Sequence, residues 1–262
     1  MAVKRVLLAY YEQDREHARL REGRGRLEFW RTQDVLRRVL PPPPARVLDV
    51  GGGTGVHAEW LTADGYHVDL LDPVPLHVER ASRLTGVTAR LGDARHLPVP
   101  DESADAVLLL GPLYHLPERA DRVRALAEAR RAVRPGGLVA AATINRHAAV
   151  LDAIHLGHYL DERDRRAAHA AAADGVMLSP RRGFPAYFHD PDEVAAEFAD
   201  AGLRGARQYG LEGVFWLYGD VDDWLDDPER RALLLDAQRS MESVPSLLGV
   251  SGHLVTLARR AR

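Results

Sequence analysis

The stretch that decides the fold reads Val47-Leu48-Asp49-Val50-Gly51-Gly52-Gly53-Thr54-Gly55. Its apolar residues favour a buried strand of a parallel sheet, and a helical pattern follows from about Val56 to Ala63. Glycines between a strand and a helix allow a sharp turn and leave the amides at the helix start open to a ligand. The stretch therefore predicts a ligand-binding turn between a strand and a helix.

The spacing of these glycines narrows the class of ligand. A dinucleotide fingerprint has glycine at its first, third and sixth positions, but the sixth position counted from Gly51 is Val56. A phosphate-binding P-loop is absent too, since no Gly-Lys-Ser/Thr follows and Lys4 is the only lysine in the chain. The motif is GxGxG, which disfavours phosphate cradling.

Further strand and helix signals follow the turn in the order of an alternating α/β fold. A helix over about 118–133 is stopped by Arg134-Pro135-Gly136-Gly137, ahead of an apolar fifth strand over 138–144. The intervening signals are a strand over 68–71 that ends in Asp72, a strand closed by Leu91-Gly92-Asp93-Ala94, and a strand over 106–110 followed by Gly111-Pro112-Leu113-Tyr114-His115-Leu116.

Together these motifs resemble the class I S-adenosylmethionine-dependent methyltransferase family, in particular its bacterial small-molecule branch. The resemblance covers roughly residues 45–145, and more loosely the rest as far as a final strand near 253–258. It implies an α/β fold with a doubly wound, mostly parallel, seven-stranded Rossmann-like sheet. It also implies S-adenosyl-L-methionine as cofactor, with S-adenosyl-L-homocysteine as the product.

The resemblance assigns cofactor contacts to several positions. Asp72, at the end of the second strand, is expected to accept both ribose hydroxyls, and Asp93 is the implied partner of the adenine amino group. Arg31 could pair with the methionine carboxylate through its planar fork of donors, although an exposed arginine on an amphipathic helix explains this residue equally well. The predicted cofactor-binding residues are Tyr11, Arg31, Asp49, Gly51, Gly53, Gly55, Asp72, Pro73, Asp93, Ala94, Leu110 and Gly111.

Catalysis is assigned to the segment after the fourth strand, where ligands meet the sheet in open α/β folds. His115 is the candidate general base, because a neutral imidazole can accept a proton near pH 7. Tyr114 is expected to orient the acceptor. A packed loop histidine is the rival interpretation of His115.

The rest of the chain predicts a lid and an insertion around the methyltransferase domain over 45–262. Residues 1–44 form an expected helical lid that ends at Pro41-Pro42-Pro43-Pro44. About 145–190 is an expected cap insertion that recognises substrate, with a loop over 183–189. A single charged helix is expected over about 222–241. No metal site is predicted, because the histidines of the insertion lack further ligands at a recognisable spacing. The predicted substrate-binding residues are His147, Leu151 and His155 on one helix face and Tyr187 in the loop.

Composition limits the possible partners. The chain has 262 residues, 46% hydrophobic content and a formal net charge of -3, which disfavours a nucleic-acid partner. It has no cysteine, which excludes disulfides and thiolate chemistry. The apolar run among its first residues is too short for a signal peptide or a membrane span. We expect a cytoplasmic protein without a membrane partner, and a monomer or a homodimer.

The expected function is methyl transfer from the cofactor to an oxygen or nitrogen atom of a small-molecule acceptor. Two alternatives keep the same cofactor: an enzyme that catalyses a reaction other than methyl transfer, and a non-catalytic cofactor-binding scaffold. A nicotinamide oxidoreductase shares the strand, turn and acidic residue, but the missing sixth-position glycine counts against it.

Overall fold

The computed structural model describes residues 19–23, 25–178 and 184–262. In these residues the chain forms a nine-stranded sheet. Its strands are β1 (Arg46–Val50), β2 (His67–Asp72), β3 (Val87–Leu91), β4 (Ala104–Leu109), β5 (Val133–Asn145), β6 (Val176–Leu178), β7 (Pro185–His189), β8 (Arg207–Gly210) and β9 (His253–Arg259).

Seven of these strands form the predicted doubly wound sheet, in the spatial order β3-β2-β1-β4-β5-β9-β8. The five strands from β3 to β5 are parallel, while β9 runs antiparallel to both β5 and β8. The strand order reverses between β1 and β4, which is the point where open α/β sheets bind ligands. The fold class expected from the sequence is therefore confirmed.

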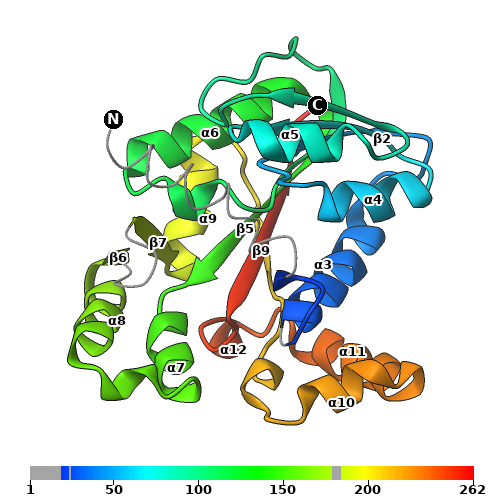
Figure 1. Cartoon of the computed structure of the whole chain (residues 1–262). Helices are drawn as coiled ribbons and strands as arrows, with labels where there is room; N and C mark the ends of the chain where they lie inside the picture. The colour runs from blue at the N-terminus through cyan, green and yellow to red at the C-terminus, as the bar shows by residue number, and fades with distance from the viewer. Residues whose placement is uncertain (1–18, 24, 179–183) are drawn as a thin grey trace.

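Helices cover both faces of the sheet (Figure 1). One face packs against α3, α4 and α5, with Leu36, Trp60 and Ala81 in its core, and the other face packs against α6 and α9, with Leu126 and Phe198. The helices are α3 (Gly25–Val39), α4 (Val56–Ala63), α5 (Pro75–Ala81), α6 (Arg119–Ala132), α7 (Ala148–His155), α8 (Glu162–Asp174), α9 (Pro191–Asp200), α10 (Val221–Asp226), α11 (Pro228–Met241) and α12 (Pro245–Leu248), with short 3₁₀ turns η1 (Leu113–His115), η2 (His158–Leu160) and η3 (Phe215–Leu217).

The two strands beyond the predicted seven, β6 and β7, belong to the segment between β5 and α9. This segment also contains α7, η2 and α8, which Figure 1 shows at one side of the sheet, away from α4 and α5. The expected loop over 183–189 is wrong for the described residues, because Pro185–His189 pairs with Val176–Leu178 in an antiparallel ladder. The backbone polar groups of the predicted loop are thus satisfied by a hairpin.

One helical prediction is wrong. The single helix expected over about 222–241 is two helices, because Asp227 caps the second with its side chain and Pro228 occupies the first helical position. Of the expected lid, the structure describes residues 19–23 and α3. That helix buries Leu27, Val35 and Leu36 completely in the domain.

No helix in the described part of the chain is long and apolar enough to cross a membrane.

Candidate functional site

The glycine turn after β1 has the backbone that only glycine adopts readily. Gly51 and Gly53 have φ angles of 70° and 57°, in the left-handed region. A Cβ atom on Gly51 would lie 2.7 Å from Cγ of Pro112, whereas one on Gly53 would meet no atom within 4 Å. The first glycine therefore permits close packing with the segment after β4, and the second leaves open space beside the turn.

This turn borders a cavity of about 370 Å³, a volume typical of small-molecule sites. The cavity lies at the carboxyl ends of β1, β2, β3 and β4, and α3 and α4 contribute to its wall. Of the predicted site residues, it is lined by Asp49, Gly51, Gly53, Asp72, Pro73, Asp93, Ala94, Leu110, Gly111, Tyr114 and His115.

Asp49 is the chemically unusual group of the cavity wall. Its side chain is fully buried, and neither carboxylate oxygen has a hydrogen-bond partner among the described residues. Burial, with a smaller effect from the charge of Asp72, raises the pKa of Asp49 to about 7. A buried carboxylate without a partner is costly, so this one is suited to a cationic ligand group that would compensate it.

Asp72 is held firmly at the end of β2. The backbone N–H of Gly53 donates to its Oδ2 at 2.9 Å, and that of Val74 donates to its Oδ1 at 2.9 Å. Nδ1 of His77 lies 3.0 Å from the same Oδ1. These contacts fix the carboxylate against the glycine turn and leave Oδ2 with capacity to accept from a ligand hydroxyl.

Asp93, the predicted adenine partner, is engaged with an arginine. Nε and Nη2 of Arg95 donate to Oδ1 and Oδ2 of Asp93 at 3.0 and 2.7 Å, and Nη1 of Arg95 donates to Asp121 at 2.8 Å. All three side chains line the cavity. A ligand amino group would have to share the Asp93 carboxylate with Arg95, and its adenine role remains a prediction.

Tyr114 and His115 lie in η1, immediately after β4. Their rings are 4.6 Å apart in an edge-to-face arrangement, and His115 also packs 5.9 Å from the ring of Phe184. A Cβ on Gly111 would be 3.4 Å from the hydroxyl oxygen of Tyr114. Both rings are therefore held in the cavity wall, where an acceptor could meet them.

The cavity wall also carries Arg19 and Glu28, together with His57 from α4. Arg19 donates from Nη1 and Nη2 to both oxygens of Glu28, at 2.6 and 3.2 Å. Burial alone would raise the pKa of Glu28, but Arg19 and His253 outweigh it and lower that pKa to about 2. Burial lowers the pKa of His57 to about 4, so this ring is neutral near pH 7.

Several predicted site residues lie elsewhere. Arg31 is fully buried and is bound to Asp34 and Glu242, while its Nε donates to the carbonyl of Leu211 at 3.0 Å. Its guanidinium therefore joins α3 to the end of α11 and does not reach the cavity. Arg19 is the described lid residue that supplies an arginine there. Tyr11 lies outside the described residues.

The predicted substrate residues of the insertion also do not line the cavity. His147 and His155 are exposed on α7 and at its start, and Leu151 is half-buried in the core of the insertion. Tyr187 packs with its ring 3.6 Å from the guanidinium of Arg122, and its hydroxyl donates to Glu193 at 3.3 Å. Helical spacing alone did not show whether these α7 residues would line the cavity. Gly55, with φ 92°, caps α4 and packs against Leu84 without lining the cavity.

The sheet order and the glycine turn are those of a Rossmann-like methyltransferase fold. Residues 48–141 match the family model described as "Methyltransferase domain". This part of the chain belongs to the class I S-adenosylmethionine-dependent methyltransferase family.

Individual relatives agree with this family. An uncharacterized methyltransferase of Mycobacterium tuberculosis is 41% identical over 116 residues, which cover 44% of this chain and 45% of the relative. A malonyl-[acyl-carrier protein] O-methyltransferase of Methylococcus capsulatus is 38% identical over 113 residues, or 40% of each chain. The match thus spans less than half the length of these curated relatives.

Solved structures resemble the whole fold. A methyltransferase from Thermotoga maritima, described as a possible histamine N-methyltransferase, superposes with a TM-score of 0.61. The similarity covers 98% of this chain and 99% of that one at 18% sequence identity. At this identity the likeness supports the fold alone.

Proposed function

We propose that this protein is a methyltransferase that moves a methyl group from S-adenosylmethionine to an oxygen or nitrogen atom of a small-molecule acceptor in the cytoplasm. The observation that carries the proposal is Asp49, a buried carboxylate without a partner among the described residues, beside a glycine turn that leaves open space. The cofactor has a sulfonium and an ammonium group, and either would compensate this charge.

The residues of the cavity fit the parts of the cofactor. Asp72 would hold the ribose, with Asp93 near the adenine, and the glycine turn would pass along the middle of the ligand. The amino-acid end, a zwitterion, would then meet Arg19 and Glu28, which are of opposite charge and also line the cavity. Arg19 takes the role that the sequence prediction gave to Arg31.

The bound cofactor supplies a methyl group on a positively charged sulfur, which is already activated for transfer. The protein therefore has to orient the acceptor and exclude water, and good orientation can contribute on the order of 7 to 11 kcal/mol. Tyr114 and His115 line the cavity next to Gly111 and are the residues that would meet the acceptor. His115 would accept a proton from an acceptor that loses one during transfer, and Tyr114 would hold the acceptor atom in place.

Calorimetry tests the cofactor, with S-adenosylmethionine and S-adenosylhomocysteine as ligands and a nicotinamide dinucleotide as the control. Micromolar binding of the first two alone is expected. An acceptor screen with mass detection then tests methyl transfer, and His115→Gln and Tyr114→Phe test the two roles. A lower kcat for His115→Gln with unchanged cofactor affinity would support the base. Cofactor binding without turnover over a broad panel would favour the scaffold alternative.

A further inference from the structure

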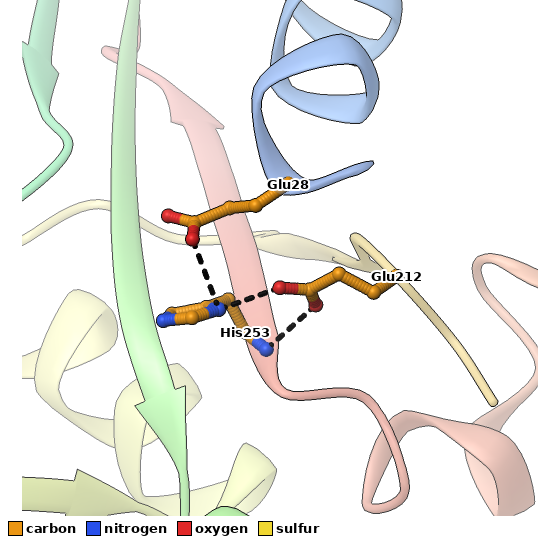
Figure 2. A group of neighbouring side chains, drawn as sticks. All are labelled: Glu28, Glu212 and His253. Atoms are coloured by element: carbon orange, nitrogen blue, oxygen red, sulfur yellow. Dashed lines mark hydrogen bonds and ion pairs between the residues drawn. The ribbon is translucent and has the colours of Figure 1, made fainter. Parts of the chain in front are cut away.

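Three groups that are far apart in the sequence meet beside the cavity (Figure 2). Glu28 belongs to α3, Glu212 follows β8, and His253 is the first residue of β9. Nδ1 of His253 lies 2.6 Å from Oε1 of Glu212 and 3.6 Å from Oε2 of Glu28. Figure 2 shows the imidazole nitrogen between the two carboxylates. The C-terminal strand is thereby connected to a residue of the cavity wall.

Glu212 is the fixed end of this cluster. Its Oε2 accepts from the backbone N–H of His253 at 2.8 Å and from Oγ of Ser251 at 2.9 Å, and the residue is only 4% exposed. Glu28 is the end that lines the cavity, and it carries Arg19 on both of its oxygens. The order of contacts is therefore Glu212, His253, Glu28 and Arg19, from the protein interior to the cavity.

The charge of His253 affects the balance of charge between the two carboxylates and Arg19. Burial would lower the pKa of His253, but the carboxylates of Glu28 and Glu212 outweigh burial and raise it above its ordinary value. A protonated His253 and Arg19 together balance the two carboxylates. If His253 were neutral, Glu28 would lose the positive charge beside its Oε2 and would depend more on Arg19, which would then be less able to bind a ligand carboxylate.

A divalent cation could use the same atoms, since the ligand atoms of the three residues lie within 4.8 Å of one another. The internal contacts favour a proton over a metal ion. Arg19 already occupies both oxygens of Glu28, and a metal ion would have to displace the His253 proton next to that positive charge. With a protonated His253, the two carboxylates are matched by the positive charges of His253 and Arg19, an arrangement that suits side-chain positioning better than metal binding.

We propose that His253 and Glu212 are positioning residues, which hold Glu28 and Arg19 in place to bind the amino-acid end of the cofactor. This inference rests on the proposed function. It makes the ligand selectivity of the cavity depend on the last strand. His253 does not line the cavity, but it controls how well the cavity distinguishes ligands that carry an amino-acid group from ligands that lack one.

The experiment compares two ligands by calorimetry. S-adenosylhomocysteine has the amino-acid group, whereas 5′-methylthioadenosine keeps the adenosine and the sulfur but has no amino-acid group. The variants are His253→Asn and Glu212→Gln. The matched control is Arg26→Gln, which removes another ion pair of α3, the one to Asp226 at 2.7 Å, outside the cavity wall.

We expect each variant to weaken S-adenosylhomocysteine binding about tenfold or more and to change 5′-methylthioadenosine binding less than threefold, with no effect in the control. Equal weakening of both ligands would overturn the inference and reduce the cluster to a structural role. Failure of the unmodified protein to bind either ligand would instead overturn the proposed function. Tight binding of Zn²⁺ or Mn²⁺ by the unmodified protein, abolished by His253→Asn, would also overturn the inference.

The pH dependence of ligand preference provides a second readout. In the unmodified protein, the preference for S-adenosylhomocysteine over 5′-methylthioadenosine should fall as pH rises through the pKa of His253. The charged and titratable groups around this histidine are Glu28, Glu212 and Arg19. Asp49 titrates separately, and its effect cancels when the profile of His253→Asn is subtracted. A preference that stays flat with pH in the unmodified protein would contradict the inference.

Discussion

Replacing Asp49 with asparagine should make the cofactor-free protein more stable and its cofactor binding weaker. The carboxylate is fully buried without a hydrogen-bond partner among the described residues, and its pKa is about 7 against an ordinary 3.8. That difference corresponds to roughly 4 kcal/mol of destabilisation once the group is ionised in the folded protein. Asparagine keeps the shape and removes the charge.

The sign of the pH dependence follows from proton binding. Between about pH 4 and pH 7, the folded protein holds a proton on Asp49 that the unfolded chain has lost, so stability falls as pH rises. Above about pH 7 both states are ionised, and the full penalty applies. The stabilisation by Asp49→Asn should therefore grow by roughly 2 to 3 kcal/mol between about pH 5 and about pH 8, and then level off.

Urea unfolding of the cofactor-free proteins at the two pH values measures this difference. The control is Asp69→Asn on β2, which removes a strand carboxylate that is paired with Arg46 at 2.6 Å and should not stabilise the protein. The affinity for S-adenosylmethionine is measured in parallel, and we expect it to fall tenfold or more in Asp49→Asn. The reasoning is refuted if Asp49→Asn is destabilised at pH 8, or if its effect on stability is the same at both pH values.

Three further changes have distinct expected results. Asp72→Ala should weaken cofactor binding by about 2 to 4 kcal/mol in calorimetry, because two ribose hydrogen bonds are lost; unchanged affinity would contradict the assignment. Gly53→Ala should reduce cofactor affinity more than stability, whereas Gly51→Ala should mainly lower the melting temperature, since its Cβ would meet Pro112 at 2.7 Å; similar outcomes for both variants would contradict the distinction. Arg122→Met should lower the free energy of unfolding by about 3 to 5 kcal/mol, as it leaves the buried Glu197 carboxylate without its arginine; a loss below about 1 kcal/mol in urea unfolding would show that the pair is not important for stability.

The sequence predicted the sheet well because each core strand is marked by its own local pattern. The apolar runs before Asp72 and after Ala104 form β2 and β4 as expected, and the Gly51 turn lies at the switch point. The helix break at Asp227-Pro228 had a readable signal too, because aspartate followed by proline is typical of a helix start. That signal was missed because the charged pattern was read as one helix.

The predicted site residues also differ in whether a local sequence pattern fixes their position. Positions fixed by a strand end or by the glycine turn, such as Asp49, Asp72 and Asp93, line the cavity as expected. Positions chosen by helix periodicity, such as Arg31 and His155, do not. Periodicity shows which side chains share a helix face, but it carries no information about what that face contacts. Tyr187 was predicted to bind substrate but does not line the cavity, and its strand was read as a loop.

The cluster of Glu28, Glu212 and His253 shows where sequence reasoning ends and what the fold adds. No local pattern relates these residues, since they come from α3, the segment after β8 and the start of β9. They meet because β9 runs antiparallel to β5, which brings its first residue to the carboxyl edge of the parallel strands, where the cavity lies. The reversed last strand thus places a histidine next to Glu28, a residue of the cavity wall. A strand that contributes to the sheet can in this way also determine the charge of the wall that would receive the cofactor.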